Sequence, residues 1–146
     1  MKQKTIGNSF FLEGVALHTG LNIKLTAHPA PANHGIVICR TDITGKPCIK
    51  AIVDNVGHTV RGTVLMNDHM QVGTVEHALA AFYAAGIDNC LFEVDGPEFP
   101  ILDGSARFFR DKILEVGVVE QDADKKYLVI TDVVECETDS GSKITA

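Results

Sequence analysis

The sequence predicts an α+β fold, a two-layer α/β sandwich in which a mostly antiparallel sheet packs against two helices. Three observations support this prediction. Short alternating or β-branched runs fill the chain to about residue 67, two segments with helical apolar spacing follow, and one apolar strand-like run lies between those two segments. Most connections between the strand-like runs are short, which favours antiparallel pairing. With 146 residues, the chain has the length of one domain or of one domain with the start of another.

The predicted strands lie mainly in the first half of the chain. They cover residues 21–26, 36–39 and 49–53, and segments rich in proline, glycine and polar residues separate them. A further strand is predicted over residues 89–94, and the rigid loop 96–100 follows it. In chain order, this last strand therefore lies between the two predicted helices.

The spacing of apolar residues predicts two helices. The first has Thr74 as its N-terminal cap and ends at Gly86, and the second has Ser105 as its cap and ends at Gly117. Their apolar residues recur at helical spacing: Val75, Ala78, Leu79 and Phe82 in the first, and Phe109, Ile113 and Val116 in the second.

The composition changes near residue 120. Residues 120–124 are acidic and polar, which is typical of a solvated linker. Beyond them, residues 127–130 and 133–136 resemble the two strands of a hairpin, which is too small to be stable alone. We therefore expect residues 1–124 to form a first domain, and residues 125–146 to be the first strands of a truncated second domain.

Charge, hydropathy and cysteine content exclude several classes of protein. The 13 basic and 19 acidic residues give a net charge of −6, the wrong sign for binding nucleic acid or anionic bilayers through bulk charge. No run approaches the roughly 18 apolar residues of a transmembrane segment, so we expect a cytoplasmic protein. The cysteines form no CxxC pair and have aliphatic neighbours, so we expect buried free thiols at Cys39, Cys48, Cys90 and Cys136.

The pair Glu76 and His77, at the start of the first predicted helix, has the residue types that metal-assisted hydrolysis requires. An imidazole can hold a zinc ion, and a neighbouring carboxylate can take a proton from water whose pKa the zinc has lowered. The positive end of the helix favours a carboxylate there. The alternative is a structural one, with a helix-start glutamate beside a half-buried histidine.

Other candidate residues are less specific. A catalytic zinc needs about three protein ligands, yet no histidine is followed four residues later by His or Asp. His18, His58 and His69 could converge with His77 only through the fold. The segment containing His18 has two glycines and could approach a ligand through its backbone, or form a hairpin turn with an exposed histidine. Helix capping explains Asp103 adequately.

Taken together, six segments in order closely resemble the N-terminal domain of the UDP-3-O-acyl-N-acetylglucosamine deacetylases. The resemblance covers essentially residues 1–124 and the first strands of that family's second domain. The segments are Gly14–Gly20 (GVALHTG), His28–Asn33 (HPAPAN), Arg40–Asp42 (RTD), Thr74–His77 (TVEH), Gly86–Asn89 (GIDN) and Pro97–Ser105 (PEFPILDGS).

The resemblance implies an activity and a set of site residues. Members of the family are cytoplasmic zinc amidases of Gram-negative bacteria, and they remove acetate from an acylated UDP-glucosamine in lipid A synthesis. By its motif, His77 corresponds to the zinc ligand of the first domain, and Glu76 to the general base. His18, with Leu17 beside it, corresponds to residues near the substrate.

The resemblance also implies that the site is incomplete within this sequence. In the family, a His and an Asp four residues apart in the second domain complete the zinc site, and a further histidine there protonates the leaving amine. None of these is present before Ala146, so we expect residues 1–146 alone to be inactive. Some relatives carry a fused acyl carrier-protein dehydratase downstream. The competing hypothesis is a non-catalytic binding or interaction module of the same fold.

Overall fold

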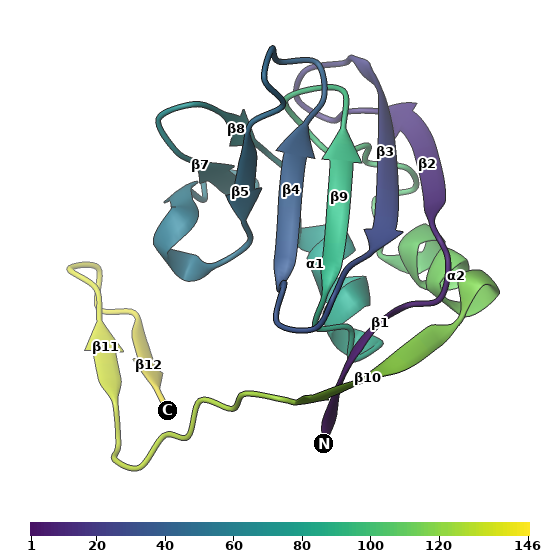
Figure 1. Ribbon diagram of the computed structural model, residues 1–146. Helices are drawn as coiled ribbons and strands as arrows, with labels where there is room; N and C mark the ends of the chain where they lie inside the picture. Colours follow the sequence, from purple (N-terminus) through teal and green to yellow (C-terminus); the bar gives the residue numbers. More distant parts are fainter.

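The computed structural model describes all 146 residues, and a five-stranded sheet lies at its centre (Figure 1). Neighbouring strands run antiparallel except β4 and β9, which are parallel, so the mostly antiparallel sheet is confirmed. In spatial order the strands are β2 (Phe10–Val15), β3 (Asn22–Pro29), β9 (Cys90–Val94), β4 (Ile36–Arg40) and β5 (Cys48–Lys50).

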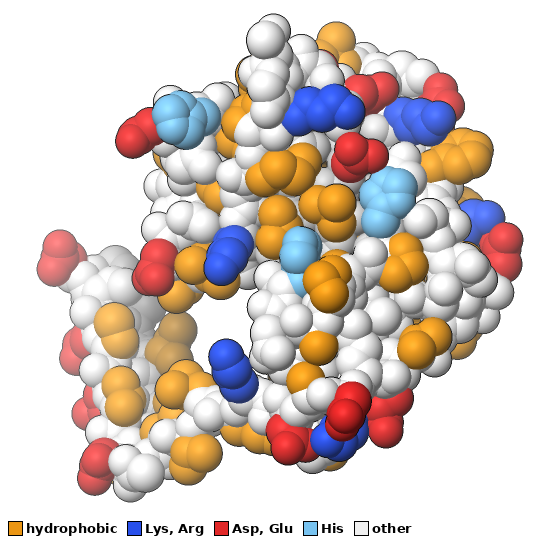
Figure 2. Space-filling model, viewed as in Figure 1, with side chains coloured by type: hydrophobic (Ala, Val, Ile, Leu, Met, Phe, Trp, Pro, Cys, Tyr) orange, Lys and Arg blue, Asp and Glu red, His pale blue; other side chains and the backbone are white.

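Two helices, α1 (Glu76–Ala84) and α2 (Arg107–Val116), cover one face of this sheet and confirm the predicted two-layer α+β fold (Figure 1). Apolar side chains from both layers fill the space between them. The rings of Phe82 on α1 and Phe92 on β9 meet edge to face with their centroids 4.8 Å apart, a favourable aromatic geometry. The opposite face of the sheet carries a mixture of charged, histidine and apolar side chains (Figure 2).

The helices end where predicted, but they begin differently. Gly86 and Gly117 have φ values of 71° and 75°, the left-handed conformation that stops a helix. Thr74 is not the cap of α1, because Val75 occupies that position and the Thr74 hydroxyl bonds to a distant side chain. At α2, Ala106 occupies the cap position, while the Ser105 hydroxyl still accepts a 3.1 Å hydrogen bond from a first-turn amide.

A second, three-stranded sheet lies beside β5 and is formed by β6 (Val56–His58), β7 (Val64–Met66) and β8 (Gln71–Val72). The strand predicted over residues 49–53 is shorter than expected, because β5 ends at Lys50 and a 3₁₀ turn occupies Val53–Asn55. The buried Arg40 side chain joins the two sheets, since its Nη1 donates a 2.7 Å hydrogen bond to the carbonyl of Gln71.

The C-terminal part of the chain departs from two predictions. Residues expected to form a solvated linker instead form β10 (Val118–Asp124), which pairs antiparallel with β1 (Lys2–Ile6). The hairpin is shifted along the chain, since it joins β11 (Glu135–Glu137) to β12 (Lys143–Thr145), and residues 127–130 form no strand. Residues 127–130 have no neighbouring strand to pair with and are exposed. The domain boundary at residue 124 stays a prediction.

The cysteine prediction is wrong for three of the four residues. Cys39 and Cys48 face each other across the β4–β5 pair and form a disulfide, and Cys136 is exposed. Cys90 alone is a buried free thiol, and burial raises its pKa to about 12. Strand register brings Cys39 and Cys48 together, which their spacing in the sequence did not indicate. Neither helix has the length and apolar character needed to span a membrane.

Candidate active site

Three chain segments lie side by side where the loop after β9 passes between the end of β2 and the start of α1. The loop pairs with the chain before α1, because the amide of Gly73 bonds to the carbonyl of Pro97 at 2.9 Å and the amide of Phe99 to the carbonyl of Gly73 at 3.0 Å. On its other side, the amide of Ile101 bonds to the carbonyl of Val15 at 3.0 Å. The loop therefore fixes both neighbours.

Thr74 turns the chain from β8 into α1. Its φ of +56° lies in the left-handed region, which is uncommon for a β-branched residue and costs conformational energy. This turn places Glu76 and His77 in the first two positions of α1, where both side chains are half-buried. The predicted pair thus lies at the positive end of a helix and is not sealed in the apolar core.

One oxygen of the Glu76 carboxylate accepts a hydrogen bond from the protein, and the other accepts none. Its Oε2 accepts a 3.0 Å hydrogen bond from the amide of Thr63. Its Oε1 faces Gly62, where a methyl group built on the glycine would lie 3.5 Å from that oxygen, 3.6 Å from Nε2 of His18 and 3.8 Å from Oγ1 of Thr74. Three polar side chains therefore surround one point beside Gly62.

A second carboxylate, Glu98, is buried at the same place with 1% of its surface exposed. It accepts a 2.8 Å hydrogen bond from the Thr74 hydroxyl, and bonds of 3.0 to 3.1 Å from the amides of His18 and Thr19. Burial acts to raise the pKa of Glu98, but these hydrogen bonds outweigh it and the pKa is lowered. The side chain is therefore an ionised, fully bonded anchor.

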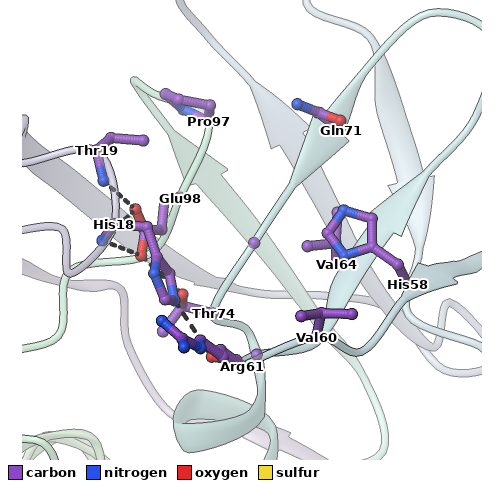
Figure 3. A pocket seen from close by; sticks show the side chains of 12 residues that line it. His18, Thr19, His58, Val60, Arg61, Val64, Gln71, Thr74, Pro97 and Glu98 are labelled. Atoms are coloured by element: carbon purple, nitrogen blue, oxygen red, sulfur yellow. Dashed lines mark hydrogen bonds between the residues drawn. The ribbon is translucent and has the colours of Figure 1, made fainter.

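A cavity of about 260 Å³ opens at these residues (Figure 3). Figure 3 shows His18, Thr74 and Glu98 on one side, with His58, Val64 and Gln71 of the small sheet on the other. The Arg61 backbone carbonyl accepts a 3.2 Å hydrogen bond from the His18 ring, which fixes that ring at the rim. The lining residues are His18, Thr19, His58, Val60, Arg61, Gly62, Val64, Gln71, Gly73, Thr74, Pro97 and Glu98.

Only some of the predicted site residues lie at the cavity. His18 lines the cavity and Glu76 borders it beside Gly62, whereas Leu17 is 58% exposed and does not line it. His77 follows Glu76 on the helix but is not part of the cavity lining. His18 and His58 line the same cavity, but no group of three His, Cys, Asp or Glu side chains is arranged to hold a metal ion.

Sequence reasoning missed Glu98 and gave little weight to His58. Glu98 lies between two prolines in a segment that indicates only a rigid loop. Its hydrogen-bond partners are 24 to 80 residues away in the chain, so no local pattern could have identified them.

Comparison with known proteins gives one consistent result. The family model described as UDP-3-O-acyl N-acetylglycosamine deacetylase matches residues 3–146. A bifunctional enzyme LpxC/FabZ of Bacteroides thetaiotaomicron is 52% identical over 145 residues, which are 99% of this chain and 32% of the relative.

Two further relatives are named UDP-3-O-acyl-N-acetylglucosamine deacetylase. The protein of Myxococcus xanthus is 47% identical over 132 residues, covering 90% of this chain and 42% of the relative. The protein of Bdellovibrio bacteriovorus is 43% identical over 132 residues, covering 90% of this chain and 44% of the relative. The chain therefore covers only 32 to 44% of the length of these three relatives.

Proposed function

Because the chain belongs to the UDP-3-O-acyl N-acetylglycosamine deacetylase family, we propose that its complete protein removes the acetyl group from UDP-3-O-acyl-N-acetylglucosamine. The products are the free amine and acetate, and the reaction belongs to lipid A synthesis in the cytoplasm of a Gram-negative bacterium. The observation that carries the proposal is the open Oε1 of Glu76, which faces the same point as the His18 ring at the start of the helix that carries His77.

A zinc ion is part of this proposal, and the residues present fit one portion of its site. His77 is half-buried at the first turn of α1, and its ring forms no hydrogen bond or ion pair within the chain, so a ring nitrogen is free to bind a metal. No three potential ligands cluster within these residues, so His77 would supply one ligand. When bound, zinc would lower the pKa of water and polarise the acetamide carbonyl.

Glu76 acts as the general base in the proposed reaction. Its Oε1 takes a proton from the attacking water as the water oxygen bonds to the acetyl carbon. The hydrogen bond from Thr63 holds Oε2, so the carboxylate is already oriented. The C–N bond then breaks, the nitrogen leaves as the amine after receiving a proton, and acetate is released. The His18 ring faces the same point and contacts the substrate.

The remaining parts of the machinery are proposed to lie outside residues 1–146. The further zinc ligands and the acid that protonates the amine belong to a second domain of the complete protein, and residues 1–146 alone turn over no substrate. Relatives at 52% and 51% identity are named bifunctional enzymes. The proposal therefore includes a fused second activity, of the acyl carrier-protein dehydratase type that some members of the family carry.

The test is the Glu76→Gln variant of the complete protein, assayed for acetate release from the acylated UDP-sugar. We expect kcat to fall by about 10²- to 10⁴-fold, the usual contribution of a general base. Glu115→Gln, an exposed glutamate near the end of α2, is the matched control and should retain the wild-type kcat. An unchanged kcat in Glu76→Gln would contradict the role of Glu76. No deacetylation by the unaltered protein would favour the non-catalytic module.

A further inference from the structure

We propose that Glu98 is a positioning residue of the deacetylase, an inference that rests on the proposed function. Its carboxylate holds two segments in place at once, the turn at His18 and Thr19 and the residue Thr74 before α1. By doing so it sets how the His18 ring and the Glu76 carboxylate face each other across Gly62. No contact between Glu98 and the reacting atoms is needed for this role.

The hydrogen bonds of Glu98 support a positioning role over a catalytic one. Its Oε1 accepts from the Thr74 hydroxyl and the His18 amide, and its Oε2 accepts from the amides of His18 and Thr19. A carboxylate with both oxygens engaged and 1% exposure has no free position for substrate or water. These hydrogen bonds therefore hold other segments of the protein in place and leave no acceptor free for a ligand.

The contact with Thr74 matters because Thr74 is in an unfavourable conformation. A β-branched residue at φ +56° persists only where the surroundings hold it. The 2.8 Å bond to Glu98 is the hydrogen bond of the Thr74 side chain, and Gly73 beside it is paired to the same loop. Two residues later the chain enters α1 at Glu76, so a change at Thr74 alters the direction in which the Glu76 side chain leaves the backbone.

The contact with the His18 turn acts on the other side of the site. Glu98 fixes the amides of His18 and Thr19, whereas the His18 ring bonds at Nε2 to the Arg61 carbonyl. His18 itself is exposed, so little packing restrains its backbone. Without Glu98, the amides of His18 and Thr19 would lose their hydrogen-bond acceptor. The backbone that carries the His18 ring would then no longer be held in one position. A displacement of about 1 Å in such an arrangement can cost about 100-fold in rate.

The test uses the complete zinc-loaded protein and separates kcat from KM. We expect Glu98→Gln to lower kcat by about 10- to 100-fold with KM changed less than about threefold, because orientation is lost and substrate contacts are kept. Thr74→Val replaces the hydroxyl with a methyl group of similar size and should lose a similar part of kcat, while Thr74→Ser retains the hydroxyl and should stay near the wild-type value. The double variant Glu98→Gln/Thr74→Val should be little worse than either single variant.

Controls distinguish this role from a general loss of folding. Glu93→Gln alters a glutamate on the far side of the sheet, bonded to His28, and should keep the wild-type kcat. Wild-type kcat in Glu98→Gln would overturn the proposal, as would a lower kcat fully explained by a smaller fraction of folded, zinc-loaded protein. Low kcat in both Thr74 variants would also overturn it. Retained activity in Glu76→Gln would instead refute the role of Glu76 as the base, and no deacetylation by the unaltered protein would refute the proposed function itself.

Discussion

The backbone amide of Thr63 donates a 3.0 Å hydrogen bond to Oε2 of Glu76. This contact joins the loop between β6 and β7 to the first turn of α1, and it brings Gly62 against the open oxygen of the same carboxylate. The loop is therefore one wall of the candidate site, and the absence of a side chain at Gly62 leaves room where three polar groups meet.

Replacement of Gly62 by alanine should impair the reaction without unfolding the protein. The added methyl would lie 3.5 to 3.8 Å from the polar atoms of Glu76, His18 and Thr74, which is ordinary van der Waals contact. We expect a change in unfolding free energy below about 1 kcal/mol. In the proposed reaction the attacking water or the substrate occupies this position, so the methyl should lower kcat by about 10- to 100-fold. Steady-state kinetics and thermal unfolding measure the two effects, with Asp68→Ala on an exposed turn as the control.

Acid should weaken the protein partly through Glu98. The folded-state pKa of Glu98 is lowered from its ordinary value of 4.5, so its stabilising contribution is present above pH 4.5 and is lost as the pH falls through the lower folded-state value. Urea unfolding of the wild type and of Glu98→Gln between pH 7 and pH 2 measures this. We expect a constant difference in free energy from pH 7 to about 5, shrinking below that. A difference independent of pH would show that ionisation of Glu98 contributes nothing.

Arg40 should support the cavity wall from a distance. Its guanidinium bonds to Asp42 at 2.6 and 2.8 Å and to the carbonyl of Gln71 at 2.7 Å. The side chain of lysine is a point donor and cannot reproduce this planar set of bonds. We expect Arg40→Lys to destabilise the protein by about 1 to 3 kcal/mol. Exchange of the backbone amide hydrogens should become faster in β7 and β8, and unchanged protection of these amides would contradict the prediction. The control is Arg110→Lys, on the surface of α2.

Local sequence signals predicted the elements whose formation depends on local chemistry. Glycines at positions 86 and 117 adopt the left-handed conformation that ends each helix, as expected. The helical spacing around Phe82 and Phe109 also identified the faces that pack on the sheet, because burial of one face is itself periodic. The TVEH motif correctly placed Glu76 and His77 at the start of a helix.

Features that depend on pairing between distant segments could not be predicted in the same way. Thr74 has the residue type of a helix cap, yet its hydroxyl bonds to Glu98, which becomes its neighbour only through folding. The acidic residues from Glu120 onward have the composition of a linker, but β1 offers them a partner strand 116 residues away. Cys39 and Cys48 likewise meet through strand register.

Zinc content separates the proposed roles of the two adjacent residues on α1. If His77 is a ligand, His77→Ala in the complete protein should lower zinc affinity by at least about 100-fold, because a ligand contributes more than the outer groups whose loss costs 10- to 100-fold. Glu76→Gln should keep its zinc and lose only deacetylation, since the carboxylate moves a proton. Elemental analysis after dialysis measures both variants. His58→Ala and His69→Ala should retain zinc, because the structure does not gather these histidines into a metal site. Full zinc occupancy in His77→Ala would remove His77 from the ligand set, and zinc loss in Glu76→Gln would make Glu76 a ligand and not a base.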